Sequence, residues 1–231
     1  MSVAAAKKAH AWIREKTVPA RLRVSEIFLS LQGEARETGW PTVFVRLTGC
    51  PLRCVWCDTA YAFKGGIFLT EDEVLDRVSG FSVPRVCVTG GEPLAQKTTL
   101  ALLTRLADRG FLVSLETSGA LPIDEVDPRV IRVVDLKPPG SGEVTRNRYE
   151  NLACLAPHDQ VKCVIADRND YEWSRSIVDQ YGLARRVEVL FSPVSGSLAP
   201  RELAEWILAD RLPVRFQLQL HKVLWGEVPG R

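Results

Sequence analysis

The strongest constraint on the fold of this chain is a regular alternation of short apolar runs with stretches of helical periodicity. The apolar runs are rich in β-branched residues and have the length of buried strands. They lie at residues 42–48, 86–89, 112–115, 131–135, 160–165, 187–191 and 214–220. Strands that alternate with helices are typical of βαβ units and a parallel sheet.

Capping residues mark the ends of the helices between these runs. The expected helices are 71–78 after Thr70, 93–109 before Gly110, 170–181 before Gly182, and 200–207, which opens with Pro200. A complete eight-fold β/α barrel takes about 250 residues. With 231 residues, this α/β chain is expected to form a partial, open β/α barrel.

Residues 1–20 and 21–231 are expected to be different kinds of segment. The first is an N-terminal extension, either a short helix at 4–13 stopped by Pro19 or a frayed terminus. The second has the size of one domain. The net charge of the whole chain is only +2, which does not indicate a nucleic-acid surface.

Neither a membrane span nor a secretory signal is expected. No apolar run reaches the ~20 residues that a bilayer requires, and charged residues interrupt the N-terminus. The chain is therefore expected to be cytoplasmic, with its six cysteines reduced.

Three cysteines lie close together at Cys50, Cys54 and Cys57, directly after the expected strand 42–48. Loops at the carboxyl ends of parallel strands carry the sites of α/β proteins. Three thiolates leave one iron of a four-iron cluster without a protein ligand, so that iron can bind a substrate. The spacing therefore predicts a [4Fe–4S] cluster with one open iron.

Two other uses of these cysteines remain open from the spacing alone. A structural zinc site needs a fourth ligand, and the chain offers Cys87, Cys154, Cys163 and His158 outside any paired motif. A redox pair of Cys54 and Cys57 would leave Cys50 without a role. The three remaining cysteines are expected to be structural, because two of them alternate with valines in strand-like runs.

Several blocks of the sequence resemble known enzymes. The C-x3-C-x2-C motif with Asp58, followed by the T-G-G-E-P segment 89–93, resembles the radical S-adenosylmethionine (SAM) superfamily, where the glycine segment lines the methionine of SAM. The blocks L-Q-G-E at 31–34 and W-C-D-T-A-Y-A at 56–62 are similar to the 7-carboxy-7-deazaguanine synthase family. Further blocks follow in family order at 116–119, 135–142, 191–194 and 218–222.

The resemblance implies a reaction as well as a fold. A reduced cluster would cleave SAM, and the radical would remove hydrogen from 6-carboxy-5,6,7,8-tetrahydropterin. The pterin would become 7-carboxy-7-deazaguanine with loss of ammonia, a step of queuosine biosynthesis, with Mg²⁺ assisting. A homodimer and an electron donor that the sequence does not identify are also implied.

Two alternatives differ in what they require. A radical SAM activase that acts on a protein glycyl residue would share the cysteine loop and the glycine turn, but would need neither the L-Q-G-E block nor Arg46. A zinc-binding module would require no catalysis at all.

The resemblance also implies the residues of the site. The cluster ligands are Cys50, Cys54 and Cys57, and the magnesium ligand is Thr59. The substrate-binding residues are Leu31, Gln32, Gly33, Glu34, Arg46, Thr89, His221 and Arg231. The SAM-binding residues are Trp56, Cys57, Asp58, Gly91, Glu92, Ser118, Lys137, Ser141, Ser192, Pro193, Val194, Ser195 and Gln219.

Side-chain chemistry bears on some of these roles. The planar fork of Arg46 suits a substrate carboxylate, with a surface salt bridge as the alternative. An ionised Glu34 is only a hydrogen-bond acceptor, which suits the N–H donors of a pterin. The Glu92 carboxylate can accept hydrogen bonds from an ammonium group. His221 is as readily a structural histidine. Some family members end at a proline, whereas here Pro229 is followed by Gly230 and Arg231, so the contact of Arg231 with the substrate stays open.

Overall fold

The computed structural model of the chain describes residues 20–226, 228 and 230. In this part, nine strands form one sheet in the order β3-β1-β2-β4-β5-β6-β7-β8-β9. The strands are β1 (Arg21–Leu31), β2 (Pro41–Leu47), β3 (Ile67–Thr70), β4 (Arg85–Gly90), β5 (Leu112–Thr117), β6 (Ile131–Leu136), β7 (Gln160–Ile165), β8 (Glu188–Pro193) and β9 (Arg215–Phe216). The expected extension 1–20 lies, except for Ala20, outside the described residues.

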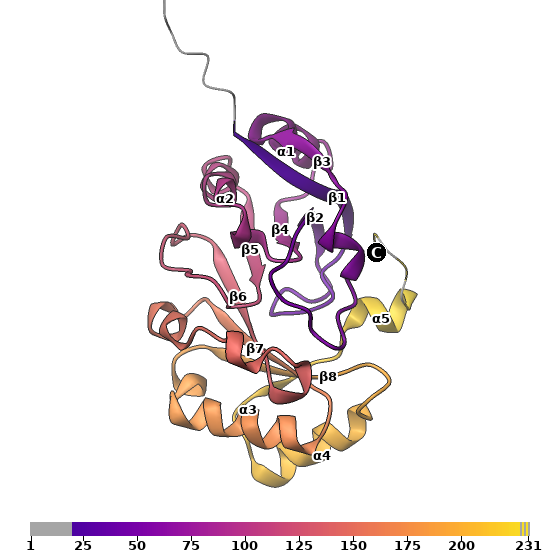
Figure 1. Cartoon of the computed structure of the whole chain (residues 1–231), viewed down its shortest axis with the longest axis vertical. Coiled ribbons are helices and arrows are strands. Elements are labelled where there is room, and N and C mark those ends of the chain that lie inside the picture. Colours follow the sequence, from indigo (N-terminus) through magenta and orange to yellow (C-terminus); the bar gives the residue numbers. More distant parts are fainter. Residues whose placement is uncertain (1–19, 227, 229, 231) are drawn as a thin grey trace, which may run out of the picture.

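The sheet is parallel except at its first edge. β1 runs antiparallel to both β2 and β3, whereas every pairing from β2 to β9 is parallel. The helices are α1 (Glu71–Ser79), α2 (Thr98–Asp108), α3 (Arg168–Gln180), α4 (Pro200–Asp210) and α5 (Leu220–Trp225). The sheet is curved, with α2, α3 and α4 along its outer side (Figure 1). α5 begins where the Leu220 amide bonds Gly33, in the loop after β1. The predicted partial β/α barrel is confirmed.

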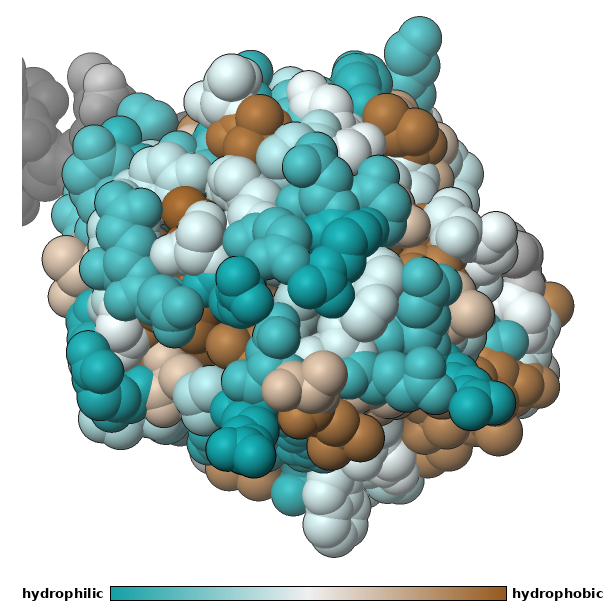
Figure 2. All heavy atoms as spheres, turned by 90° about the horizontal axis from the view of Figure 1, so that it is seen from below, coloured by the Kyte–Doolittle hydropathy of each residue, from teal (hydrophilic) through white to brown (hydrophobic). Residues whose placement is uncertain are grey.

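Burial explains why the parallel strands read as continuous apolar runs. Every residue of β7 is buried, because the helices cover one face of the sheet and the barrel interior covers the other. On the outer side, α2 contributes Leu102, Leu103 and Leu106, all without exposed surface. The end of the molecule that carries α3 and α4 is mainly hydrophilic, with hydrophobic groups scattered over it (Figure 2).

Local capping chemistry sets the helix starts. Thr70 accepts a hydrogen bond from the Glu73 amide, and the Glu73 carboxylate accepts one from the Thr70 amide, so α1 begins with a complete capping box. The expected helix 93–109 is wrong at its start. Pro93–Ala95 forms only a 3-10 turn, and α2 begins at Thr98, because Gln96 is extended and its side chain bonds the backbone of Arg23.

The expected strand 214–220 is also wrong over most of its length. Only Arg215–Phe216 pairs with β8, and α5 already begins at Leu220. The chain leaves the sheet here because its next polar groups bond elsewhere: the Leu220 amide donates to the Gly33 carbonyl at 2.9 Å. β1, β3 and α5 were not expected, since their apolar residues follow neither period cleanly.

The loop between β1 and β2, residues 32–40, reaches across the open side of the barrel. The Gln217 side chain accepts from the Ala35 amide at 2.7 Å and donates to the Ala35 carbonyl at 2.8 Å, as a neighbouring strand would. The Arg36 amide donates to Gln160 of β7 at 2.7 Å, and its guanidinium pairs with Glu188 of β8 at 2.9 Å. This loop therefore ties the first strands to the last ones.

Among the described residues, no helix combines the length and the apolar character that a membrane crossing requires.

Replacing Gln217 with Met should weaken this closure. The variant leaves the buried amide of Ala35 without its acceptor, so we expect the free energy of unfolding to fall by about 1–3 kcal/mol in urea denaturation. Gln180→Met, at the exposed end of α3, is the matched control and should change it by no more than about 0.5 kcal/mol. Equal effects of the two substitutions would contradict the closing role of Gln217.

Candidate active site

A cavity of about 390 Å³ opens inside the partial barrel, between the carboxyl ends of the strands, the cysteine loop and α5. Its wall includes all three loop cysteines and Thr59. It also includes these residues predicted to bind substrate or SAM: Leu31, Gln32, Gly33, Glu34, Arg46, Trp56, Asp58, Thr89, Gly91, Ser118, Lys137, Val194, Ser195, Gln219 and His221. The fold thus brings together residues from nearly the whole described chain. Arg231 lies outside the described residues.

The cysteine loop is held in place by its own backbone contacts. The Arg53 amide donates to the Glu143 carboxylate at 2.5 Å, and the Val55 amide donates to the Ser141 carbonyl at 3.0 Å. The Arg53 guanidinium bonds the Cys50 carbonyl and lies 4.3 Å from the centre of the Phe63 ring. The side chain of Val55 is 77% exposed, so the loop has solvent on one side and the cavity on the other.

The glycine turn after β4 packs directly under this loop. A Cβ atom on Gly91 would lie 2.3 Å from the Gly49 carbonyl oxygen and 2.7 Å from the Cys50 Cβ atom. The Glu92 amide donates to that same Gly49 carbonyl at 2.8 Å. The turn therefore needs glycine because the cysteine loop approaches its backbone too closely for any side chain.

The three cysteines suit a multi-iron cluster. All of them carry free, half-buried thiols, and a cluster spreads its ligands over several irons, so they need not converge on one point. Among the described residues, no three His, Cys, Asp or Glu side chains come close enough to share a single metal ion. Burial raises the pKa of the Cys50 and Cys54 thiols, so cluster binding there releases protons.

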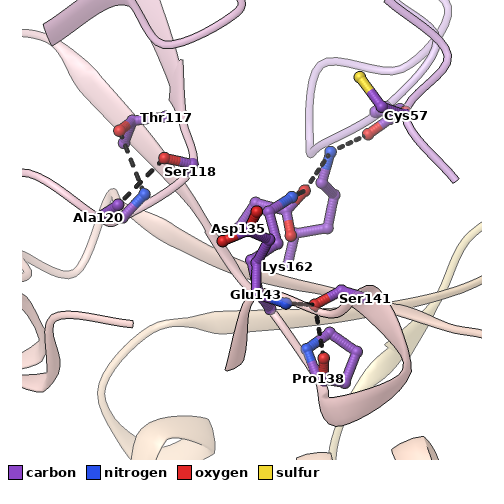
Figure 3. A network of polar contacts seen from close by, with 12 residues as sticks. Cys57, Thr117, Ser118, Ala120, Asp135, Pro138, Ser141, Glu143 and Lys162 are labelled. Atoms are coloured by element: carbon purple, nitrogen blue, oxygen red, sulfur yellow. Dashed lines mark hydrogen bonds and ion pairs between the residues drawn. The ribbon is translucent and has the colours of Figure 1, made fainter. Parts of the chain in front are cut away.

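Four residues predicted to bind SAM are buried behind the cavity wall rather than in it: Glu92, Ser141, Ser192 and Pro193. The Glu92 carboxylate accepts from the Thr117 hydroxyl and from both the amide and the hydroxyl of Ser118, which ties the end of β4 to the end of β5. Ser141 donates to the Pro138 carbonyl at 2.6 Å (Figure 3). In this structure the side chains of Glu92 and Ser141 therefore hold neighbouring segments of the chain in position.

Arg46 lies on β2 with its guanidinium at the cavity. Its Nε atom pairs with Glu26 of β1 at 2.6 Å, and the Tyr61 hydroxyl donates to the same carboxylate at 2.8 Å. The guanidinium lies within 6 Å of the centres of the Phe28 and Tyr61 rings. The salt bridge thus lies at the edge of the cavity, where Arg46 is part of the wall and Glu26 is not, and it uses Nε, which leaves the terminal nitrogens available to a second anion.

Glu34 is fixed by groups from the opposite side of the barrel. Lys162 of β7 pairs with one carboxylate oxygen, and the Gln219 amide donates to the other at 2.7 Å. Burial alone would raise the pKa of Glu34, but the Lys162 ammonium and these hydrogen bonds lower it to about 2. Lys162 also lies 3.4 Å from Asp135 of β6 (Figure 3). Asp135 in turn pairs with Lys137 at 3.0 Å.

α5 contacts both the 32–40 loop and the cysteine loop. His221 packs on Gly33 so closely that a Cβ atom there would lie 2.2 Å from its Nδ1 atom. Lys222 pairs with Asp58, beside the cysteine loop, at 3.3 Å. Burial lowers the pKa of His221. A neutral imidazole can donate from one nitrogen and accept at the other.

Three charged residues of the cavity wall were not predicted: Glu116, Asp135 and Lys162. Glu26, the partner of Arg46, was not predicted either. The signal that singled out Arg46, a charge inside an otherwise apolar strand, is also present at Lys162 in the run V-K-C-V. Of the cysteines expected to be structural, Cys87 and Cys163 are buried, whereas Cys154 is exposed. Thr59 lies with its hydroxyl 3.8 Å from the Cys57 sulfur.

Comparison with known proteins agrees with this arrangement. Residues 44–133 match the family model of the Radical SAM superfamily. The chain is 50% identical over 210 residues to the 7-carboxy-7-deazaguanine synthase of Chlorobaculum tepidum, which covers 90% of this chain and 96% of that protein. It is 44% identical over 219 residues to the enzyme of the same name from Koribacter versatilis. That match covers 88% of this chain and 97% of the other protein.

The fold has a solved counterpart in QueE from Escherichia coli. The two structures superpose with a TM-score of 0.70, at 24% sequence identity, over 87% of this chain and 95% of the other. The curved sheet, the cavity and its three-cysteine loop define a radical SAM enzyme. Within that superfamily, the chain belongs to the 7-carboxy-7-deazaguanine synthase family.

Removing one loop cysteine should abolish cluster binding. We expect Cys54→Ala, after anaerobic reconstitution, to lose the iron, sulfide and visible absorbance that the unchanged protein acquires, because two thiolates cannot hold the cluster. Cys154→Ala removes an exposed cysteine that is not part of the cavity wall, and should reconstitute fully. A complete cluster in Cys54→Ala would contradict the assignment.

Proposed function

We propose that this chain converts 6-carboxy-5,6,7,8-tetrahydropterin to 7-carboxy-7-deazaguanine with release of ammonia, as a step of queuosine biosynthesis. The observation that carries the proposal is that one cavity holds the three-cysteine loop together with Arg46 and Glu34. Substrate and product differ by the elements of one ammonia, so the conversion is redox-neutral overall. The names of the relatives support the same reaction.

The cofactors are a [4Fe–4S] cluster and SAM, which together supply the radical that removes hydrogen from the substrate. Cys50, Cys54 and Cys57 hold three irons. The backbone at Gly91, brought to the cavity wall by the glycine turn, provides a face without side chains for the methionine part of SAM. Lys137, which pairs with Asp135 at 3.0 Å, adds a partly exposed ammonium at the cavity wall, which suits the carboxylate of SAM.

The substrate is held by complementary charge at its two ends. The terminal nitrogens of Arg46 bind the pterin carboxylate, and the Thr89 hydroxyl, opposite Arg46 in the strand register, lies beside them. At the other end, Glu34 accepts from the amino and ring N–H groups of the pterin. His221 closes the site above Gly33 and excludes water from that end.

Magnesium, an external electron donor and a second subunit complete the proposal. The Thr59 hydroxyl provides an oxygen ligand at the cavity wall, and Mg²⁺ binds through few protein oxygens together with water and substrate oxygens. The cluster is reduced by a donor whose identity the chain does not specify. A C₂ homodimer is the commonest symmetric assembly for such a chain.

An anaerobic assay tests the reaction directly. Reconstituted protein with SAM, a reductant, Mg²⁺ and the tetrahydropterin should release 7-carboxy-7-deazaguanine, identified by mass spectrometry, while Cys54→Ala should release none. If protein with an intact cluster cleaves SAM but leaves the pterin unchanged, the substrate assignment is wrong.

The magnesium ligand has its own signature. Because Thr59→Ala removes the side-chain oxygen but not the cluster ligands, we expect iron content to be unchanged and the stimulation of turnover by Mg²⁺ to fall sharply. Thr59→Ser keeps the oxygen and should keep the stimulation. Full magnesium dependence in Thr59→Ala would remove this residue from the metal site.

A further inference from the structure

Lys162 is a buried cation for which sheet packing gives no reason. It lies in the middle of β7 between Val161 and Cys163, and only 7% of the residue is exposed. Burying an ammonium has a desolvation cost, and an apolar side chain of similar length would fill the same space without that cost. Its presence therefore calls for an explanation in terms of the groups it faces.

Those groups come from three different elements around the cavity. Lys162 pairs with Glu34 of the 32–40 loop and lies 3.4 Å from Asp135 of β6, while Glu116 of β5 adds a further negative charge. Only Glu34 reaches Lys162 from across the open side of the barrel. Lys162 is thus the residue of the sheet that holds Glu34, within the loop that carries the L-Q-G-E block.

The contact fixes both the direction and the charge of the Glu34 carboxylate. One oxygen is held by Lys162 and the other by Gln219, so the plane of the carboxylate is set from two sides. A carboxylate has about four acceptor positions, and two hydrogen bonds leave the remaining ones for the cavity. His221 and Glu116 are the other titratable groups facing Glu34, and neither replaces the ammonium as a hydrogen-bonded partner.

We propose that Lys162 is a positioning residue that sets substrate specificity, by holding Glu34 as an ionised, aligned acceptor for two adjacent N–H donors. The inference rests on the proposed pterin substrate, whose 2-amino group and ring N–H form such an edge. An analogue with a 2-oxo group in place of the amino group would turn an acceptor toward Glu34, and the site would reject it.

Two oxidised, fluorescent analogues make this measurable without turnover. 6-Carboxypterin keeps the amino edge and the carboxylate, whereas 6-carboxylumazine has the 2-oxo edge. Fluorescence titration of the full chain should show that the unchanged protein prefers the pterin. Lys162→Met should weaken the binding of 6-carboxypterin about tenfold or more, since the contact of the substrate with Glu34 is misaligned. The ratio of its affinity to that of 6-carboxylumazine should fall.

Two controls separate positioning from general damage. Lys162→Arg retains the cation and should keep most of the preference, and Lys97→Met, at an exposed lysine, should change neither affinity. In reconstituted Lys162→Met, the Michaelis constant for the tetrahydropterin should rise, while the iron and sulfide content of the cluster stays unchanged.

A double variant covers the case in which Lys162→Met does not fold, because Glu34→Gln removes the carboxylate that the substitution leaves unpaired. If Lys162 acts through Glu34, the double variant binds 6-carboxypterin as Glu34→Gln alone does. Independent, multiplicative losses would overturn the inference, and so would an unchanged preference in folded Lys162→Met. Failure of the unchanged protein to bind either analogue would instead count against the proposed substrate.

Discussion

The bonds between the 32–40 loop and the far strands are the constraint on which the rest of the site depends. An open barrel has two free edges, and here the loop after β1 bonds to β7, β8 and the segment after β9. Because that loop also carries Gln32 and Glu34, closing the fold and placing the recognition groups are the same event. The Gln217 side chain substitutes for a strand, so the closure needs no extra β element.

Two close backbone contacts, one at Gly91 and one at Gly33, then place the functional residues around the cavity. On one side, the glycine turn lets the cysteine loop lie against the end of β4. On the other, His221 lies against Gly33, so α5 can cover the cavity. Substituting either glycine would act on the position of a functional neighbour rather than on the backbone conformation alone.

The sequence predicted the parallel strands and the cysteine loop well, because both are local patterns. Apolar runs report burial directly, and the spacing of the three cysteines limits what they can bind. It failed where a group bonds to a distant segment: the Gln96 side chain bonds Arg23 and interrupts the expected helix, and the Leu220 amide bonds Gly33 where the expected strand should continue. The same limit applies within the site. The sequence names Glu92 as a SAM-binding residue, but it does not reveal that the Glu92 carboxylate also accepts hydrogen bonds from Thr117 and Ser118 at the end of β5.

The cysteine loop has one more consequence, since it forms the whole thickness of the wall at that point. Val55 is 77% exposed, while its neighbours Cys54 and Trp56 line the cavity. An electron arriving from solution therefore crosses a single layer of polypeptide, without a relay of intermediate centres. Dioxygen has the same short path. The same thin wall therefore gives an external reductant and dioxygen equally short access to a cluster held by this loop.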